Sequence, residues 1–174
     1  MRCPNCSAAV SDSNVICPEC GCETISGLPM RWHLFLVHLG LFVFGVGLIL
    51  MGILILVGIQ YLVQGLIPGT VYGRFVALNI IDVVYGVVLI LLGVLCFFIR
   101  SWLAAFRKKG VAALYCVYAA AIVCSVLYSV LSSWAVGTPA GRLFGLTELA
   151  PLVGMAAGVA LNALYYKKRS FLFR

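Results

Sequence analysis

Residues 32–59 read "WHLFLVHLGLFVFGVGLILMGILILVGI", which is the most informative stretch for fold class. Between Arg31 and Arg74 the sequence contains no formally charged residue. At about 1.5 Å per residue, a helix over this stretch is long enough to cross a hydrocarbon core about 30 Å thick. The stretch therefore predicts a first membrane-spanning helix.

The whole composition agrees with an integral membrane protein. The 174-residue chain is 64% hydrophobic and only 10% charged, and its mean hydropathy is +1.14. Soluble domains are about half apolar and about one quarter charged. We therefore predict an all-α membrane protein, a four-transmembrane-helix bundle with a small N-terminal zinc ribbon held by four cysteines. The expected parts are the ribbon over 1–25, a linker over 26–31 and a membrane domain over 32–174, with spans over about 32–59, 75–99, 111–134 and 146–166.

The basic residues predict the orientation of this bundle. Four spans place both termini on one side, and positive charge accumulates on the cytoplasmic side of membrane proteins. Only Arg74 and Arg142 fall on the opposite side. The ten on the terminal side are Arg2, Arg31, Arg100, Arg107, Lys108, Lys109, Lys167, Lys168, Arg169 and Arg174. We expect a multi-pass protein of the bacterial inner membrane with cytoplasmic N- and C-termini.

Four cysteines near the N-terminus have the spacing of a metal site. Cys3, Cys6, Cys17 and Cys20 form Cys-x2-Cys-x10-Cys-x2-Cys within "CPNC" and "CPECG". Two such knuckles can place four thiolates tetrahedrally around one ion, which is a closed, structural Zn²⁺ site. Rubredoxin-like iron and thiol redox chemistry are the alternatives, although a cytoplasmic location disfavours disulfides. Cys22 is a fifth thiol that is either a bystander or able to exchange with Cys20.

Asp82 is the formal charge that lies clearly inside a predicted span. Asn79 precedes it by about one turn, and a lone carboxylate in hydrocarbon costs several kcal/mol. One interpretation is a structural clamp in which Arg74 or Arg142 pairs with Asp82. The other is an ion, proton or ligand site, which corresponds to a small transporter or channel around Asp82 and Asn79.

Small residues recur every fourth position along the last predicted span, where they favour close helix packing. We leave open whether the partner is the glycine-rich first helix or another protomer in a homo-oligomer. The series comprises Ala150, Gly154, Gly158 and Asn162, and the first helix carries Gly40, Gly45, Gly47 and Gly52.

Two classes of function are not expected. Residues 1–30 hold one basic residue, Arg2, against Asp12, Glu19 and Glu23. Nucleic-acid binders gather Lys and Arg on one face, so we expect no nucleic-acid partner. The sequence also lacks a constellation of nucleophile, base and cofactor, so we expect no enzyme.

The chain resembles a group of uncharacterised bacterial zinc-ribbon membrane proteins. The resemblance rests on "CPNC…CPECG", "LPMRWHLFLVHLGLF", "IIDVVYGVVLI" and "NALYYKKRSFLF" and spans nearly the whole chain. It implies zinc at the four N-terminal cysteines and carries no activity with it. We therefore expect a cytoplasmic zinc-ribbon module on an anchor in the lipid bilayer. Its expected role is that of an interaction or regulatory scaffold, with a protein partner or as a homo-oligomer.

Overall fold

The computed structural model describes residues 3, 5–11, 14, 16–22, 30–137, 146–167, 169 and 173, and gives only the backbone of 146–152. This part of the chain is mainly helical except in the N-terminal segment, where Ala9 and Ile16 take part in isolated β-bridges. The elements are α1 (Arg31–Phe35), the π-helical turn η2 (Leu36–Gly40), α2 (Leu41–Val57), α3 (Ile59–Leu62), α4 (Pro68–Arg74), α5 (Val76–Ala104), α6 (Lys108–Val136) and α7 (Leu146–Lys167).

Three of the described helical segments are long and apolar enough to cross a membrane: Arg31–Val57, Val76–Ala104 and Lys108–Val136. They correspond to the first three spans expected from the sequence. The fourth expected span overlaps α7, a helix of 22 residues that is not among these three.

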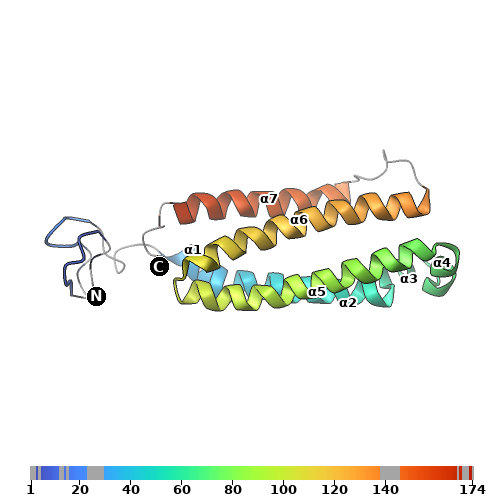
Figure 1. Cartoon of the computed structure of the whole chain (residues 1–174), viewed down its shortest axis with the longest axis horizontal. Coiled ribbons are helices and arrows are strands. Elements are labelled where there is room, and N and C mark those ends of the chain that lie inside the picture. Colours follow the sequence, from blue (N-terminus) through green and yellow to red (C-terminus); the bar gives the residue numbers. More distant parts are fainter. Residues whose placement is uncertain are drawn as a thin grey trace.

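The helices run side by side in alternating directions (Figure 1). α2 lies beside α5, and α6 lies beside α7, while the short helices α3 and α4 lie at one end of the bundle. The start of α1, the α5–α6 turn and the end of α7 lie at the opposite end. We call the end with α3 and α4 the hairpin end. We call the opposite end the basic end, because it carries Arg31, Arg107, Lys108, Lys109 and Lys167.

The π-helical turn η2 sets the buried face of the first span. His33, Val37, Leu41 and Gly45 are all buried and follow one another at intervals of four. In a regular α-helix each such step rotates the side chain by about 40°, so the series would leave the core. A π-turn holds more residues per turn, which keeps these positions on one face.

Glycines let α2 and α5 approach until their backbones touch. A Cβ built on Gly52 would lie 2.6 Å from the Gly86 carbonyl oxygen, and one on Gly93 would lie 2.7 Å from that of Gly45. In each helix the two glycines are seven residues apart, or two turns, and therefore share a face. Two of the four glycines of the first span, Gly45 and Gly52, thus pack on α5.

The small residues of α7 only partly pack as expected. Gly158 faces the Tyr118 ring of α6, whose nearest atom would be 3.8 Å from an added Cβ, whereas Gly154 faces open space. Asn162 is buried, and its Oδ1 accepts a hydrogen bond from Trp32 Nε1 at 3.0 Å. Asn162 therefore makes one of the polar contacts from α7 to the first span, and Tyr166 makes another with His33.

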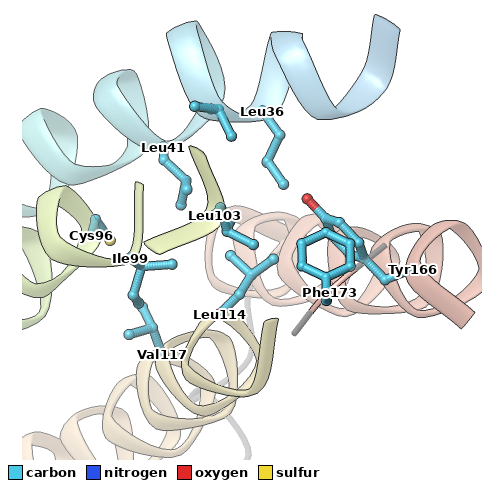
Figure 2. Close-up of a cluster of buried hydrophobic side chains, with 10 residues drawn as sticks. Leu36, Leu41, Cys96, Ile99, Leu103, Leu114, Val117, Tyr166 and Phe173 are labelled. Atoms are coloured by element: carbon cyan, nitrogen blue, oxygen red, sulfur yellow. The ribbon is translucent and has the colours of Figure 1, made fainter. Parts of the chain in front are cut away.

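Apolar side chains from four helices meet at the basic end (Figure 2). Leu36 and Leu41 of the first span, Ile99 and Leu103 of α5, Leu114 and Val117 of α6, and Tyr166 of α7 converge there with Phe173. Leu41, Ile99, Leu103 and Leu114 are fully buried. This cluster fixes the α5–α6 turn against the start of the first span.

An aromatic cluster around His33 extends this core. The His33 ring stacks on Phe106 with centroids 5.0 Å apart, and Nδ1 lies 3.2 Å from the Tyr166 hydroxyl. Phe106 closes α5 with a left-handed φ of 51°, a conformation that usually favours glycine at a helix C-terminus. We infer that the stacking of Phe106 on His33 offsets the strain of this backbone conformation, because glycine has no ring to stack there.

Candidate metal centre and buried carboxylate

The two Cys-x-x-Cys segments form nearly equivalent turns. In the first, the Ser7 amide donates to the Cys3 carbonyl at 3.0 Å, and the Cys3 amide donates to the Ala8 carbonyl at 2.8 Å. In the second, Gly21 donates to Cys17 and Cys17 donates to Cys22, both at 2.9 Å. Ser7 and Gly21 occupy equivalent positions with φ of 60° and 67°.

These turns bring the four predicted ligands together. The Sγ atoms of Cys3, Cys6, Cys17 and Cys20 all lie within 4.8 Å of one another. Cys3 and Cys20 are separated by 3.5 Å, and Cys6 and Cys17 by 3.7 Å. A tetrahedral site with metal–sulfur bonds of about 2.3 Å has sulfur–sulfur edges of about 3.8 Å. The four cysteines can therefore hold one metal ion.

The surroundings of the Cys3 thiol suit metal binding. The Cys6 backbone amide is the largest of the effects that lower the pKa of Cys3 to about 6, although burial opposes it. Metals bind thiolates, so amides that stabilise the deprotonated form also favour the metal-bound site. The segment has little other core, because its described buried apolar residues are Cys3, Val10 and Cys17, with Cys22 packed against them.

Cys22 is close to the site but is placed differently from the four ligands. Its Sγ lies 3.2 Å from that of Cys3, and it occupies the position that Ala8 has in the first turn. The neighbouring thiols of Cys3 and Cys20 raise the pKa of Cys22 to about 12. The pKa of Cys6, one of the four ligands, is also raised to about 12, so this shift does not distinguish Cys22 from them.

The second candidate site is the Asp82 carboxylate, which is 1% exposed. Its Oδ2 accepts hydrogen bonds from Tyr61 at 2.7 Å, Tyr72 at 3.0 Å and Gln60 Nε2 at 3.1 Å. Its Oδ1 accepts one from Tyr128 at 3.0 Å. Four neutral donors from α3, α4 and α6 thus satisfy one carboxylate of α5.

Arg74, one of the two arginines that we expected to pair with Asp82, is not among the hydrogen-bond partners of Asp82 in the described part of the chain. Arg74 lies at the C-terminal end of α4, and its guanidinium is 5.5 Å from the centroid of the Phe75 ring. Tyrosines take its place because α3 and α4 fold over the start of α5 and direct hydroxyls inward. Arg142, the other expected partner, lies outside the described residues.

Asn79 is not brought to this site. It is exposed, although it precedes Asp82 by three residues on α5. Residues three apart differ by about 60° around a helix, and this rotation turns Asn79 out of the interface that buries Asp82.

The sequence interpretation missed the four donors of Asp82. Gln60, Tyr61 and Tyr72 lie between the first two expected spans, and Tyr128 lies in the last third of the third one. The sequence did contain a signal: several hydrogen-bonding side chains fall at the same end of the expected spans as Asp82. Buried polar groups in a membrane require partners, so these side chains were the candidates.

No protein-family model, curated protein or solved structure matches this chain. The resemblance to bacterial zinc-ribbon membrane proteins therefore rests on the sequence motifs. The structure supports two general features of it, a cluster of four cysteines that could hold a metal ion and helices long enough to cross a membrane.

Proposed function

We propose that the chain is a membrane-anchored zinc-ribbon protein whose ribbon acts through protein contacts. The observation that carries this proposal is the convergence of Cys3, Cys6, Cys17 and Cys20 on two matching turns. Zn²⁺ is the ion that four cysteines typically bind in closed structural sites. Four protein ligands leave no open position for catalysis, which supports a binding or regulatory role rather than an enzyme.

Metal analysis of the purified, reduced protein tests the zinc assignment. We expect one zinc per chain, loss of the metal in Cys20→Ser, and retention in the matched variant Cys22→Ser. Iron in place of zinc, or loss of metal in Cys22→Ser with retention in Cys20→Ser, would contradict this ligand set.

The membrane domain is proposed to hold four spans in the bacterial inner membrane, with both termini in the cytoplasm. α7 supports this arrangement because its 22 residues run alongside α6 and give a length of about 33 Å. The gathering of basic residues at one end agrees with the positive-inside rule. Reporter fusions at Lys109 and at the C-terminus should score cytoplasmic, whereas insertions near Gly69 and Gly141 should score external.

The exposed side chain of Ile16 supports a protein contact on the ribbon. It is 58% exposed and directly precedes Cys17. A photoreactive amino acid at position 16 in cells should form a defined crosslink that disappears when Cys20→Ser removes the metal site. The same probe at Ser11, which is also exposed on this segment, is the control. Equal labelling at both positions would argue against a specific partner surface.

The alternative of a small transporter or channel at Asp82 receives less support. A transport carboxylate must exchange partners, whereas Asp82 is buried and already accepts four hydrogen bonds. Flux through proteoliposomes that is abolished by Asp82→Asn would favour the transporter over the anchor.

A further inference from the structure

A cleft of about 930 Å³ lies between α2 and α6. α5 forms its floor through Leu78, Tyr85 and Leu89, and Met155 of α7 contributes to one wall. Its volume is near the upper end of the range of about 300–1,000 Å³ that is usual for small-molecule sites.

The cleft is polar at one end and apolar at the other. Gln60, Gln64, Ser132 and Ser133 line it at the hairpin end. Val43, Phe44, Leu48, Leu89 and Ala121 line it toward the middle of the bundle and the basic end. Within the described part of the chain, the lining residues carry no formal charge at neutral pH. This change from polar to apolar lining runs along the helix axes, across the depth of the membrane. It matches the polar head and the apolar chain of an amphiphile.

The cleft opens on the side of the bundle. Val43, Met51 and Val136 line it and are also exposed. Gly47 lines it as well, and a Cβ built there would meet no atom within 4 Å. In a bilayer, the side of a helix bundle faces lipid chains, so a membrane-dissolved molecule can enter without crossing water.

Gln60 provides an unused acceptor at the polar end. Its Nε2 donates to Asp82, which fixes the amide and leaves Oε1 for another partner. Oε1 is buried and has no hydrogen-bond partner in the described part of the chain. A buried acceptor without a donor costs about 1–3 kcal/mol, so a ligand that donates a hydrogen bond here is favoured.

We propose that this cleft binds a neutral membrane amphiphile, with a hydroxyl-bearing head at Gln60 and an apolar chain along α2, α5 and α6. An anionic head is disfavoured because none of the described lining residues is basic and because the Asp82 carboxylate is hydrogen-bonded to Gln60 and Tyr61, which line the cleft. A second copy of the chain is a poorer occupant, since an apolar helix would leave Gln60 Oε1 unpaired. This site is separate from the ribbon and from its proposed protein contact.

A photoreactive monoacylglycerol with a diazirine in its chain tests the site on the purified full-length protein in nanodiscs. We expect crosslinks at Met51, Leu89 and Met155, mapped by mass spectrometry. Unlabelled monoacylglycerol should compete with the probe, and phosphatidylglycerol should not. Gly47→Leu places a side chain in the cleft, at a position where an added Cβ meets no atom within 4 Å, and should reduce cleft labelling about tenfold, which corresponds to about 1.4 kcal/mol of lost affinity.

Gly154→Leu is the matched control, because Gly154 is also a helical glycine with no atom within 4 Å of an added Cβ, and it is not among the residues that line the cleft. It should label as the unmodified protein does. Equal loss in both variants, or labelling spread over the outer faces, would overturn the proposal. So would competition by phosphatidylglycerol, or a dimer that Gly47→Leu dissociates, since the cleft would then bind anionic lipid or a second copy.

Discussion

The hydroxyl of Tyr128 on α6 lies 3.0 Å from Oδ1 of Asp82 on α5. The Tyr128 ring also stacks on Tyr85 of α5, with centroids 4.1 Å apart and an angle of 14° between the planes. Tyr61 and Tyr72 contact each other edge to face while both donate to Oδ2. One carboxylate therefore fastens the third span and the hairpin end to α5 without a cation among the described residues.

Replacing Asp82 should destabilise the bundle at the hairpin end. Asp82→Asn removes one acceptor oxygen and turns an amide donor toward hydroxyls that already donate. Intramembrane hydrogen bonds contribute about 0.6 kcal/mol each on average, so we expect a loss of about 2 kcal/mol for Asp82→Asn and about 1 kcal/mol for Tyr128→Phe. Thermal unfolding in detergent measures both.

Asn79→Ala is the control for this pair, because Asn79 is exposed on the same helix and should change stability by less than about 0.5 kcal/mol. Equal melting temperatures for Asp82→Asn and the unmodified protein would show that the four hydrogen bonds have no structural role.

The contrast between Asp82 and its partners shows what the sequence can reveal. Hydropathy alone locates the first three spans, because a bilayer requires long uninterrupted apolar helices. The burial of Asp82 also follows from its charge. The identity of its donors does not follow from the sequence. Three of them reach Asp82 only because α3 and α4 fold over α5, and the hydropathy of that connection indicates no more than a turn.

The metal site was predictable for a different reason. Each pair of cysteines is local in sequence, and a local turn determines where its sulfurs point. Packing between helices is not local: the contact of Gly52 with Gly86 and the wider turn η2 depend on which helix faces which. Their signals, a seven-residue glycine spacing and a four-residue series from His33, are visible in the sequence but do not specify a partner.

The glycine contacts predict opposite effects for two substitutions in α2. Gly52→Ala places a methyl group 2.6 Å from the Gly86 carbonyl oxygen and 2.7 Å from Ile90 Cγ1, so α2 and α5 must separate. Overpacking of this kind costs about 1–3 kcal/mol. Gly47→Ala meets nothing within 4 Å and should be neutral or stabilise the helix by about 0.5–1 kcal/mol. Unfolding of both variants in one detergent gives the comparison, and similar losses would contradict the close contact.

Tyr72 should ionise late. Burial, followed by its hydrogen bond to Asp82 and the charge of Asp82, raises its pKa from 10.0 to about 12. Because the folded state favours the neutral phenol, this contribution to stability is fully present below about pH 10 and is lost as pH rises toward about 12. The difference in tyrosinate absorbance between the unmodified protein and Tyr72→Phe isolates this group. We expect its midpoint to move partway toward about 10 in Asp82→Asn; an unchanged midpoint would exclude a contribution from the carboxylate.

Removal of the metal should unfold the ribbon and spare the bundle. The buried apolar side chains of the ribbon are too few to fold it, whereas the bundle has its own core around Leu41 and Ile99. A chelator should therefore abolish protection of the Cys17 amide from hydrogen exchange and leave the melting temperature of the helices within error. Parallel loss of helical structure would show that the two parts are coupled.

The two equivalent turn positions predict opposite changes in metal affinity. Ser7 holds φ of 60°, a left-handed conformation that costs an ordinary residue about 1–2 kcal/mol, whereas Gly21 holds φ of 67° without that cost. Ser7→Gly should relieve the strain, and Gly21→Ala should introduce it, where an added Cβ meets no other atom. Because we expect metal binding to fold the proposed ribbon, each change should shift apparent zinc affinity about tenfold, tighter for Ser7→Gly and weaker for Gly21→Ala. Competition with a chromophoric chelator measures both, and shifts of the same sign would show that the two turns are not equivalent.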